Sequence, residues 1–178
     1  MSEAPTTTVA PPWLRGVARA VDWLAGAAVL EAAFALTPWL PVRGLVTVGD
    51  EVLLGLDIAT GLFTVWLAPT LSETLSGATV GKTLLGLRTV RAVDGAPPSA
   101  PAAAWRNLLV FLDVPLFGMV SYSEMARSPR RQRSIDARYE VEVVRARDAR
   151  QPTAALWGVP AGLAAALAFV LLSYVVTG

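Results

Sequence analysis

The amino-acid sequence predicts an α-helical integral membrane protein with three full spans, a re-entrant or interfacial helical hairpin and a small cytoplasmic two-strand element. Three observations predict this fold class. The 178-residue chain is 54% hydrophobic and only 16% charged, whereas soluble domains keep roughly a quarter of their residues charged. The charges gather in a few stretches between long apolar runs, and the basic residues are shared unequally among those stretches.

The chain divides into a tail, a membrane domain and a last span. Residues 1–12 are small, polar and proline-rich, which predicts a disordered tail. Residues 13–150 are expected to form the membrane domain, and residues 151–178 a C-terminal transmembrane span. Each expected span has enough apolar residues to cross a bilayer. The spans run approximately from Val17 to Trp39, from Leu45 to Leu71 and from Ala154 to Val176.

A row of small residues lies inside the last span. Gly158, Gly162 and Ala166 recur at every fourth position, and such a row lets a second helix approach closely. Because this spacing is also common by chance in spans rich in alanine and glycine, the sequence leaves open whether the row is a packing seam.

The apolar run from Leu108 to Met119 is too short for a span and is interrupted by Asp113 and Pro115. Cytoplasmic loops of membrane proteins carry an excess of Lys and Arg. If this run does not cross, every basic residue except Arg43 falls on one side. We therefore expect residues 101–125 to form a hairpin that enters and leaves the membrane at its cytoplasmic face. The protein is expected in a bacterial cell membrane, with its N-terminus on the cytoplasmic side.

Two extended segments flank this hairpin. Residues 85–93 are followed by Asp94-Gly95, a turn signal. Residues 139–145 alternate between apolar and charged positions. We expect them to pair as a two-stranded sheet, with Glu140 and Glu142 near Arg88 and Arg91 across the ladder.

Carboxylates inside apolar runs are the candidate ion-pathway residues, because a charged side chain in a membrane is costly and usually faces a bundle interior or water. They are Asp22, Glu31, Asp57 and Asp113. Asp57 has no basic residue at its expected depth, so it either handles an ion or proton or makes a structural polar contact. For Asp22 two pairings stay open: a local ion pair with Arg19, and a pair with Arg106 that docks the hairpin onto the first span.

Several classes of site are excluded or disfavoured by composition. The chain has no cysteine and no histidine, and its net charge is only +1, so we expect no disulfide, thiolate or imidazole metal site, and no nucleic-acid partner. The segment from Gly77 to Thr83 differs from a phosphate-binding P-loop, because Ser76 stands where that motif needs glycine. No cofactor and no enzymatic activity are predicted.

Short motifs in a fixed order resemble the RDD family of membrane proteins, which are named for one Arg and two Asp. The first expected span opens with R-x-x-A-x-x-x-D. The second expected span is followed by an acidic residue and then by G-x-T-x-G-K and L-G-L-R-x-V. The pattern R-R-x-R-x-x-D precedes the last expected strand. The family-motif residues are Arg15, Asp22, Glu73, Thr79, Gly81, Lys82, Arg106 and Asp136. The sequence departs from the family pattern at Ser134-Ile135 and in its extra C-terminal span.

The resemblance implies a membrane protein connected with transport, with some relatives similar to cation/proton antiporters. Our leading hypothesis is therefore a cation transporter that exchanges its cation for protons, with Asp57 and Asp22 as the carrying carboxylates. Three spans are few for a pathway, so a homo-oligomer is expected. The alternative is a non-transport scaffold that binds a cytoplasmic protein partner through the basic segment from Arg127 to Arg138, which would otherwise lie beside anionic lipid head groups.

Overall fold

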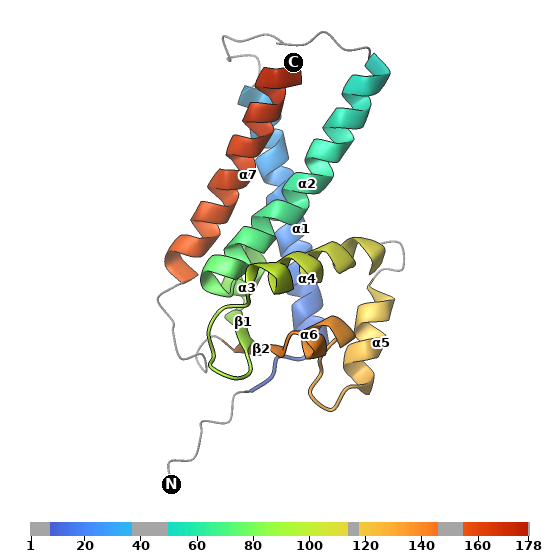
Figure 1. Ribbon diagram of the computed structural model, residues 1–178, viewed down its shortest axis with the longest axis vertical. Coiled ribbons are helices and arrows are strands. Elements are labelled where there is room, and N and C mark those ends of the chain that lie inside the picture. The colour runs from blue at the N-terminus through green and yellow to red at the C-terminus, as the bar shows by residue number, and fades with distance from the viewer. Residues whose placement is uncertain (1–7, 37–49, 114–117, 146–154, 178) are drawn as a thin grey trace.

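The computed structural model describes residues 8–36, 50–113, 118–145 and 155–177. In this part of the chain the fold is mostly helical, with a two-stranded antiparallel sheet. Three long helices run side by side, and the short elements gather at one end of them (Figure 1). The long helices are α1 (Pro12–Leu36), α2 (Asp50–Ser76) and α7 (Ala155–Thr177). The short elements are α3 (Val80–Leu84), β1 (Leu87–Arg91), α4 (Ala100–Asp113), α5 (Met119–Arg127), α6 (Ser134–Arg138) and β2 (Val141–Arg145).

The three apolar segments predicted as spans are helical. The expected end of the first and start of the second fall within residues 37–49, which lie outside the described residues. Among the helices that are described, none meets the combined length and hydropathy needed to cross a membrane. The three spans therefore stay a prediction.

The row of small residues in α7 is a packing seam against α2. A Cβ atom added to Gly158 would lie 2.4 Å from the Cβ atom of Ser76, and one added to Gly162 would lie 2.2 Å from the Ser72 hydroxyl oxygen. Ala166 in the same row is fully buried. The absence of a side chain at these two glycines thus allows α2 and α7 to approach this closely.

The predicted strand pairing is confirmed, and its register places the arginines and glutamates diagonally across the ladder rather than directly opposite one another. β1 and β2 are antiparallel, and Arg88 lies opposite Val144 while Arg91 lies opposite Val141. Glu142 lies opposite Val90 instead, and Arg91 makes an ion pair with Asp94 at 2.6 Å. The alternation predicts which residues share a face, but a small change of register decides which side chains meet.

The end of the predicted disordered tail is ordered. Val9 forms a bridge with Val144 on β2, and the Ala10 amide donates to the Val143 carbonyl at 2.8 Å. Ala10 is fully buried in a small core with Ala18, Leu87 and Val143. Helix α1 follows at Pro12, a residue well suited to a first helical position. Residues 1–7 lie outside the described residues.

The predicted helical hairpin consists of α4 and α5. Its break, residues 114–117, lies outside the described residues. On either side of it, both Asp113 carboxylate oxygens accept hydrogen bonds at 3.0 Å from the Val120 and Ser121 amides, which satisfies free donors in the first turn of α5. The Trp66 indole on α2 donates to the Ala104 carbonyl at 3.0 Å and ties α4 to α2.

Candidate functional site

A buried charge network occupies the end of the molecule where the short elements gather. Its centre is Asp136 on α6, which is 1% exposed. Asp136 Oδ1 lies 2.7 Å from Arg106 Nη1 on α4 and 3.2 Å from Arg133 Nη2. Its second oxygen lies 3.8 Å from Arg15 Nη1 on α1. Three guanidinium groups thus converge on one carboxylate.

The network continues through Glu73 at the end of α2. Glu73 is fully buried, accepts a hydrogen bond from the Lys82 ammonium on α3, and lies 3.6 Å from Arg106 Nε through its other oxygen. Lys82 also donates to the Thr89 hydroxyl on β1 at 2.7 Å. Arg106 is therefore the bridge between the two carboxylates.

The surroundings keep both carboxylates charged. Burial raises the pKa of Glu73, but the positive charges of Lys82 and Arg106 outweigh it and lower that pKa to about 2. Burial likewise disfavours the charged form of Asp136, but Arg106 and Arg133 hold its pKa well below the usual range. Burial lowers the pKa of Lys82 to about 8 against the opposing charge of Glu73.

Basic groups outnumber acidic ones in this network. The cations are Arg15, Lys82, Arg106 and Arg133, and the carboxylates are Glu73 and Asp136. Burial lowers the pKa of Arg15 to about 10, although Asp136 opposes the shift. Within the described residues, the Arg15 Nε, the Arg106 Nε and Nη1 and the Glu73 Oε2 atoms are buried and make no hydrogen bond of good geometry. Three donors against one acceptor therefore lack such a bond in the network.

Asp22 does not pair with Arg106, so that prediction is wrong. One oxygen of Asp22 accepts a hydrogen bond from the Thr79 hydroxyl and the other from the Gly81 amide, both at 2.7 Å. The alternative local pair with Arg19 is also absent from the described ion pairs, and Arg19 Nη2 donates to the Asn107 side-chain oxygen at 2.9 Å. Asp22 docks α3 onto α1, and Arg19 docks α4 onto α1.

Gly81 is required by the same contact between α3 and α1. A Cβ atom at position 81 would lie 1.9 Å from the Ala18 carbonyl oxygen, a distance that no side chain can adopt. Thr79 precedes the helix as its cap, with its hydroxyl 3.4 Å from the Lys82 amide. The Thr79–Lys82 segment therefore positions Lys82 towards Glu73 by lying directly on the backbone of α1.

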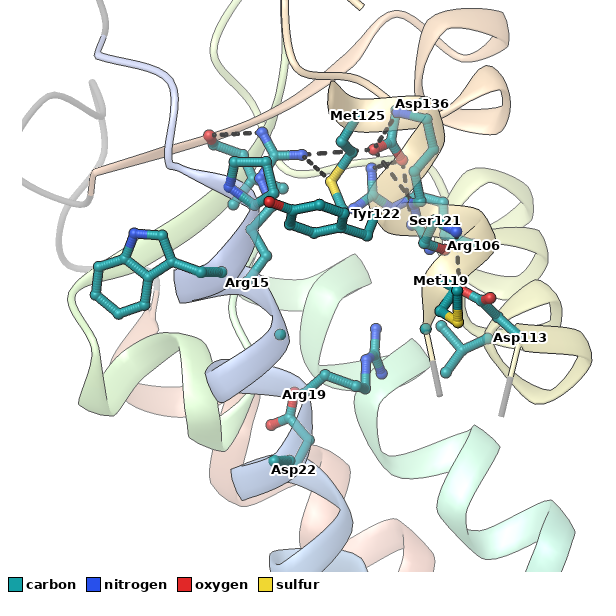
Figure 2. Close-up of a pocket in the computed structure, with 18 of the residues that line it drawn as sticks. Arg15, Arg19, Asp22, Arg106, Asp113, Met119, Ser121, Tyr122, Met125 and Asp136 are labelled. Atoms are coloured by element: carbon teal, nitrogen blue, oxygen red, sulfur yellow. Dashed lines mark hydrogen bonds and ion pairs between the residues drawn. The ribbon is translucent and has the colours of Figure 1, made fainter. Parts of the chain in front are cut away.

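A pocket of about 720 Å³ lies beside the network, between α1, α4 and α5. In Figure 2, Arg15, Arg19 and Asp22 follow one another along α1, and Arg106, Asp113 and Met119 lie on the opposite wall. Five basic and three acidic side chains line it, namely Arg15, Arg19, Lys82, Arg106, Arg133, Asp22, Asp113 and Asp136. Its apolar lining includes Trp13, Trp23, Val110, Met119, Tyr122 and Met125.

The other predicted site residues lie outside the network. Asp113 lines the pocket but caps α5. Glu31 is exposed on α1. Asp57 lies on α2, and its side chain is outside the described residues. In the basic segment, Arg127, Arg130, Arg131 and Arg138 are exposed, whereas Arg133 joins the network. The described residues contain no group of three acidic side chains that could hold a metal ion.

Arg133, which the sequence assigns to the basic segment, instead pairs with Asp136. Two further polar residues of the site carry no role in the sequence-based prediction: Thr89 binds Lys82, and Asn107 binds Arg19. Each stands next to or within a motif, and Asn107 directly follows Arg106 in an otherwise apolar stretch. A polar residue adjoining a motif charge is the signal that could have identified them.

Comparison with known proteins supports the motif resemblance. A family model described as RDD family matches residues 9–139, which include every residue of the buried charge network. No curated protein matches the chain. No solved structure matches it. The family match specifies no transported substrate.

Proposed function

The chain belongs to the RDD family, and from that premise we propose that it is a membrane protein that binds an anion in the pocket beside its charge network. The location proposed is the bacterial cell membrane, with the N-terminus and the pocket on the cytoplasmic side. The carrying observation is the excess of basic over acidic side chains lining the pocket.

Membrane location is supported by apolar side chains on the outside of the long helices. Leu24 on α1, Ile58 and Leu62 on α2, and Leu172 on α7 are all exposed. The segment from Ala154 to Val176 contains no charged residue. Large exposed apolar surfaces mark protein or membrane contacts, and the membrane character of the family favours the second.

Anion binding is supported by the local electrostatics. A cation that entered the pocket would meet five positive side chains against three negative ones, whereas an anion would be attracted. Arginine also presents donors in a planar fork that matches carboxylate and phosphate oxygens. The donors of Arg15 and Arg106 that lack hydrogen bonds of good geometry lie beside this pocket.

Cation transport in exchange for protons stays a separate proposal. Both Asp22 oxygens already accept hydrogen bonds, so Asp22 is better suited to docking α3 than to carrying an ion. The proposal then depends on Asp57, an acidic residue inside the apolar sequence of α2. Proteoliposome flux of Na⁺, K⁺ and H⁺ with and without Asp57 tests it.

The exposed arginines between Arg127 and Arg138 are proposed to contact anionic head groups or a cytoplasmic protein partner. The charge and exposure of these side chains support either contact. Assembly into a homo-oligomer is likewise a proposal, and it belongs with the transport hypothesis, because three spans alone leave little room for a pathway.

Anion binding is tested by thermal unfolding of the purified protein in neutral detergent, with phosphate or chloride at equal ionic strength. A ligand that binds only the folded state raises the unfolding midpoint, so phosphate should raise it for the natural chain and for Arg138→Gln, whose site is exposed. Arg19→Gln, which keeps a donor for Asn107, should lose most of the rise. An equal rise in all three proteins, or none, contradicts the proposal.

A further inference from the structure

The pocket separates a charged floor from an apolar mouth. The floor contains Lys82, Arg106 and Asp136, which are buried, and Arg19, which is half-buried. The mouth contains Trp13, Met119 and Tyr122, which are 64%, 68% and 58% exposed. A small soluble anion would use only the floor. A ligand with a charged head and an apolar chain would use both.

The charge count indicates a singly charged head. Five basic and three acidic side chains line the pocket, and Glu73 contacts Lys82 and Arg106 from behind. With Glu73 included, five positive charges face four negative ones. One additional negative charge neutralises the group, and a buried group is most stable when its charges are balanced.

An exposed apolar stripe on α1 continues from the mouth of the pocket. Trp13, Val17, Ala20 and Leu24 are all exposed, and their spacing of four, three and four residues places them on one side of a helix. Trp13 and Ala20 line the pocket, whereas Leu24 lies beyond it. The stripe therefore leads from the mouth of the pocket along the outer face of α1.

We propose that the pocket binds a membrane phospholipid with a singly charged anionic head, the head on the arginine floor and an acyl chain along the stripe on α1. A phosphodiester carries one negative charge and presents paired oxygens to arginine. The acyl chain packs along the apolar side chains of the stripe, and these dispersion contacts add to the binding of the head. This inference rests on the proposed anion binding and names the ligand class for the same pocket.

Native mass spectrometry of the whole protein in neutral detergent tests the inference. The probes are short-chain phosphatidylglycerol, phosphatidylcholine with the same chains, glycerophosphoglycerol as the head alone, and decanoate. Phosphatidylglycerol should bind once per chain and at least about tenfold more tightly than the zwitterionic lipid, because the basic side chains of the pocket repel the choline cation. The head alone should bind more weakly than the lipid.

Two matched pairs of variants separate head from chain. Arg19→Gln should weaken binding of phosphatidylglycerol and of the head alone about tenfold, and Arg138→Gln should weaken neither. Leu24→Ser should weaken the lipid several-fold and leave the head unchanged, whereas Ile58→Ser, at an exposed site on α2, should change neither.

The remaining outcomes distinguish this inference from the proposed function. If the head alone binds as tightly as the lipid, anion binding stands and the phospholipid is wrong. If decanoate binds more tightly than phosphatidylglycerol, the ligand is a carboxylate amphiphile and the phospholipid is again wrong. If phosphatidylcholine binds equally well, the inference fails. If Arg19→Gln changes the binding of no anionic probe, both the inference and the proposed anion site fail.

Discussion

Glu73 shows how much the site depends on single residues. Its carboxylate is fully buried and contacts a lysine from α3 and an arginine from α4. Removing one member of a buried ion pair leaves the other charge without compensation, which typically costs ~3–5 kcal/mol. The negative charge of Glu73 therefore allows Lys82 and Arg106 to be buried.

Glu73→Gln should lower the free energy of unfolding by about 3 kcal/mol or more, because the amide fills the same space without neutralising the two cations. Thermal unfolding of the detergent-purified protein measures the change. Glu140→Gln is the matched control, since Glu140 is exposed, and it should leave the midpoint nearly unchanged. Equal midpoints for the two variants would mean that Glu73 does not stabilise the network.

Acid should destabilise the natural chain more than Glu73→Gln. The pKa of Glu73 is about 2 in the folded protein against an ordinary value of 4.5. A lowered carboxyl pKa contributes stability that is present above the ordinary value and is lost as the pH falls towards the folded value. The unfolding midpoint should thus fall between pH 4.5 and 2, and more steeply in the natural chain. Parallel curves would contradict this reasoning.

The sequence identified the charged residues of the site but not their partners. All eight family-motif residues lie in the charge network or in the contact between α1 and α3. The sequence nevertheless suggests Arg19 or Arg106 as the partner of Asp22, and the described part of the structure shows neither ion pair. Seven helical residues separate Asp22 from Arg15 along α1, roughly 10 Å, and Arg15 is the residue level with Asp136 and Arg106. Such distances between helices cannot be read from spacing within one helix.

At the scale of elements, the parts with a strong local pattern were predictable. The alternation in residues 139–145 gave a strand, and the long apolar runs gave α1, α2 and α7. The five-residue helices α3 and α6 were not predicted, because helices this short depend on tertiary contacts and caps more than on their own sequence. The bridge from Val9 to β2 was not predicted either, because a single paired residue produces no periodic pattern in the sequence.

The seam between α2 and α7 should not tolerate a large side chain at Gly162. Gly162→Leu would place atoms where the Ser72 hydroxyl oxygen and the Ala68 carbonyl oxygen lie, so α7 must move away from α2. Overpacking of this kind typically costs about 1–3 kcal/mol. Ala164→Leu is the control, because Ala164 is exposed on the same helix. Thermal unfolding of the detergent-purified protein measures the change.

The two variants should differ in thermal stability. The unfolding midpoint should fall for Gly162→Leu and stay close to that of the natural chain for Ala164→Leu, because only the first substitution overfills the contact between α2 and α7. Equal midpoints for the two variants would mean that α7 accommodates the leucine at position 162 without moving.

At the scale of the whole molecule, charged and apolar parts lie at opposite ends. The sheet and the short helices share the end at which the described part of the chain begins, and the three long helices extend away from it (Figure 1). The residues of the charge network and many of those that line the pocket belong to this end. This polarity agrees with a cytoplasmic end and a membrane-embedded end. It also places Ala96 and Ser128, on either side of the α4–α5 hairpin, among the short elements.

Single cysteines at Ala96 and Ser128 should both resist an impermeant thiol reagent in intact cells, because the predicted topology puts residues 77–150 on the cytoplasmic side. The chain has no cysteine of its own, so any labelling reports the introduced residue. A cysteine at Arg43, between the first two expected spans, should be labelled and serves as the positive control. Labelling at Ser128 with protection at Ala96 would mean that the hairpin crosses.

The charge network joins residues that leave the ribosome at different times. Arg15 is made early and Asp136 near the end of the family domain, so at ordinary synthesis rates Arg15 waits roughly ten seconds for its carboxylate. Of the two network carboxylates, Glu73 is synthesised first and Asp136 last. The contacts of Arg15 and Arg106 with Asp136 can therefore form only after α6 has been synthesised.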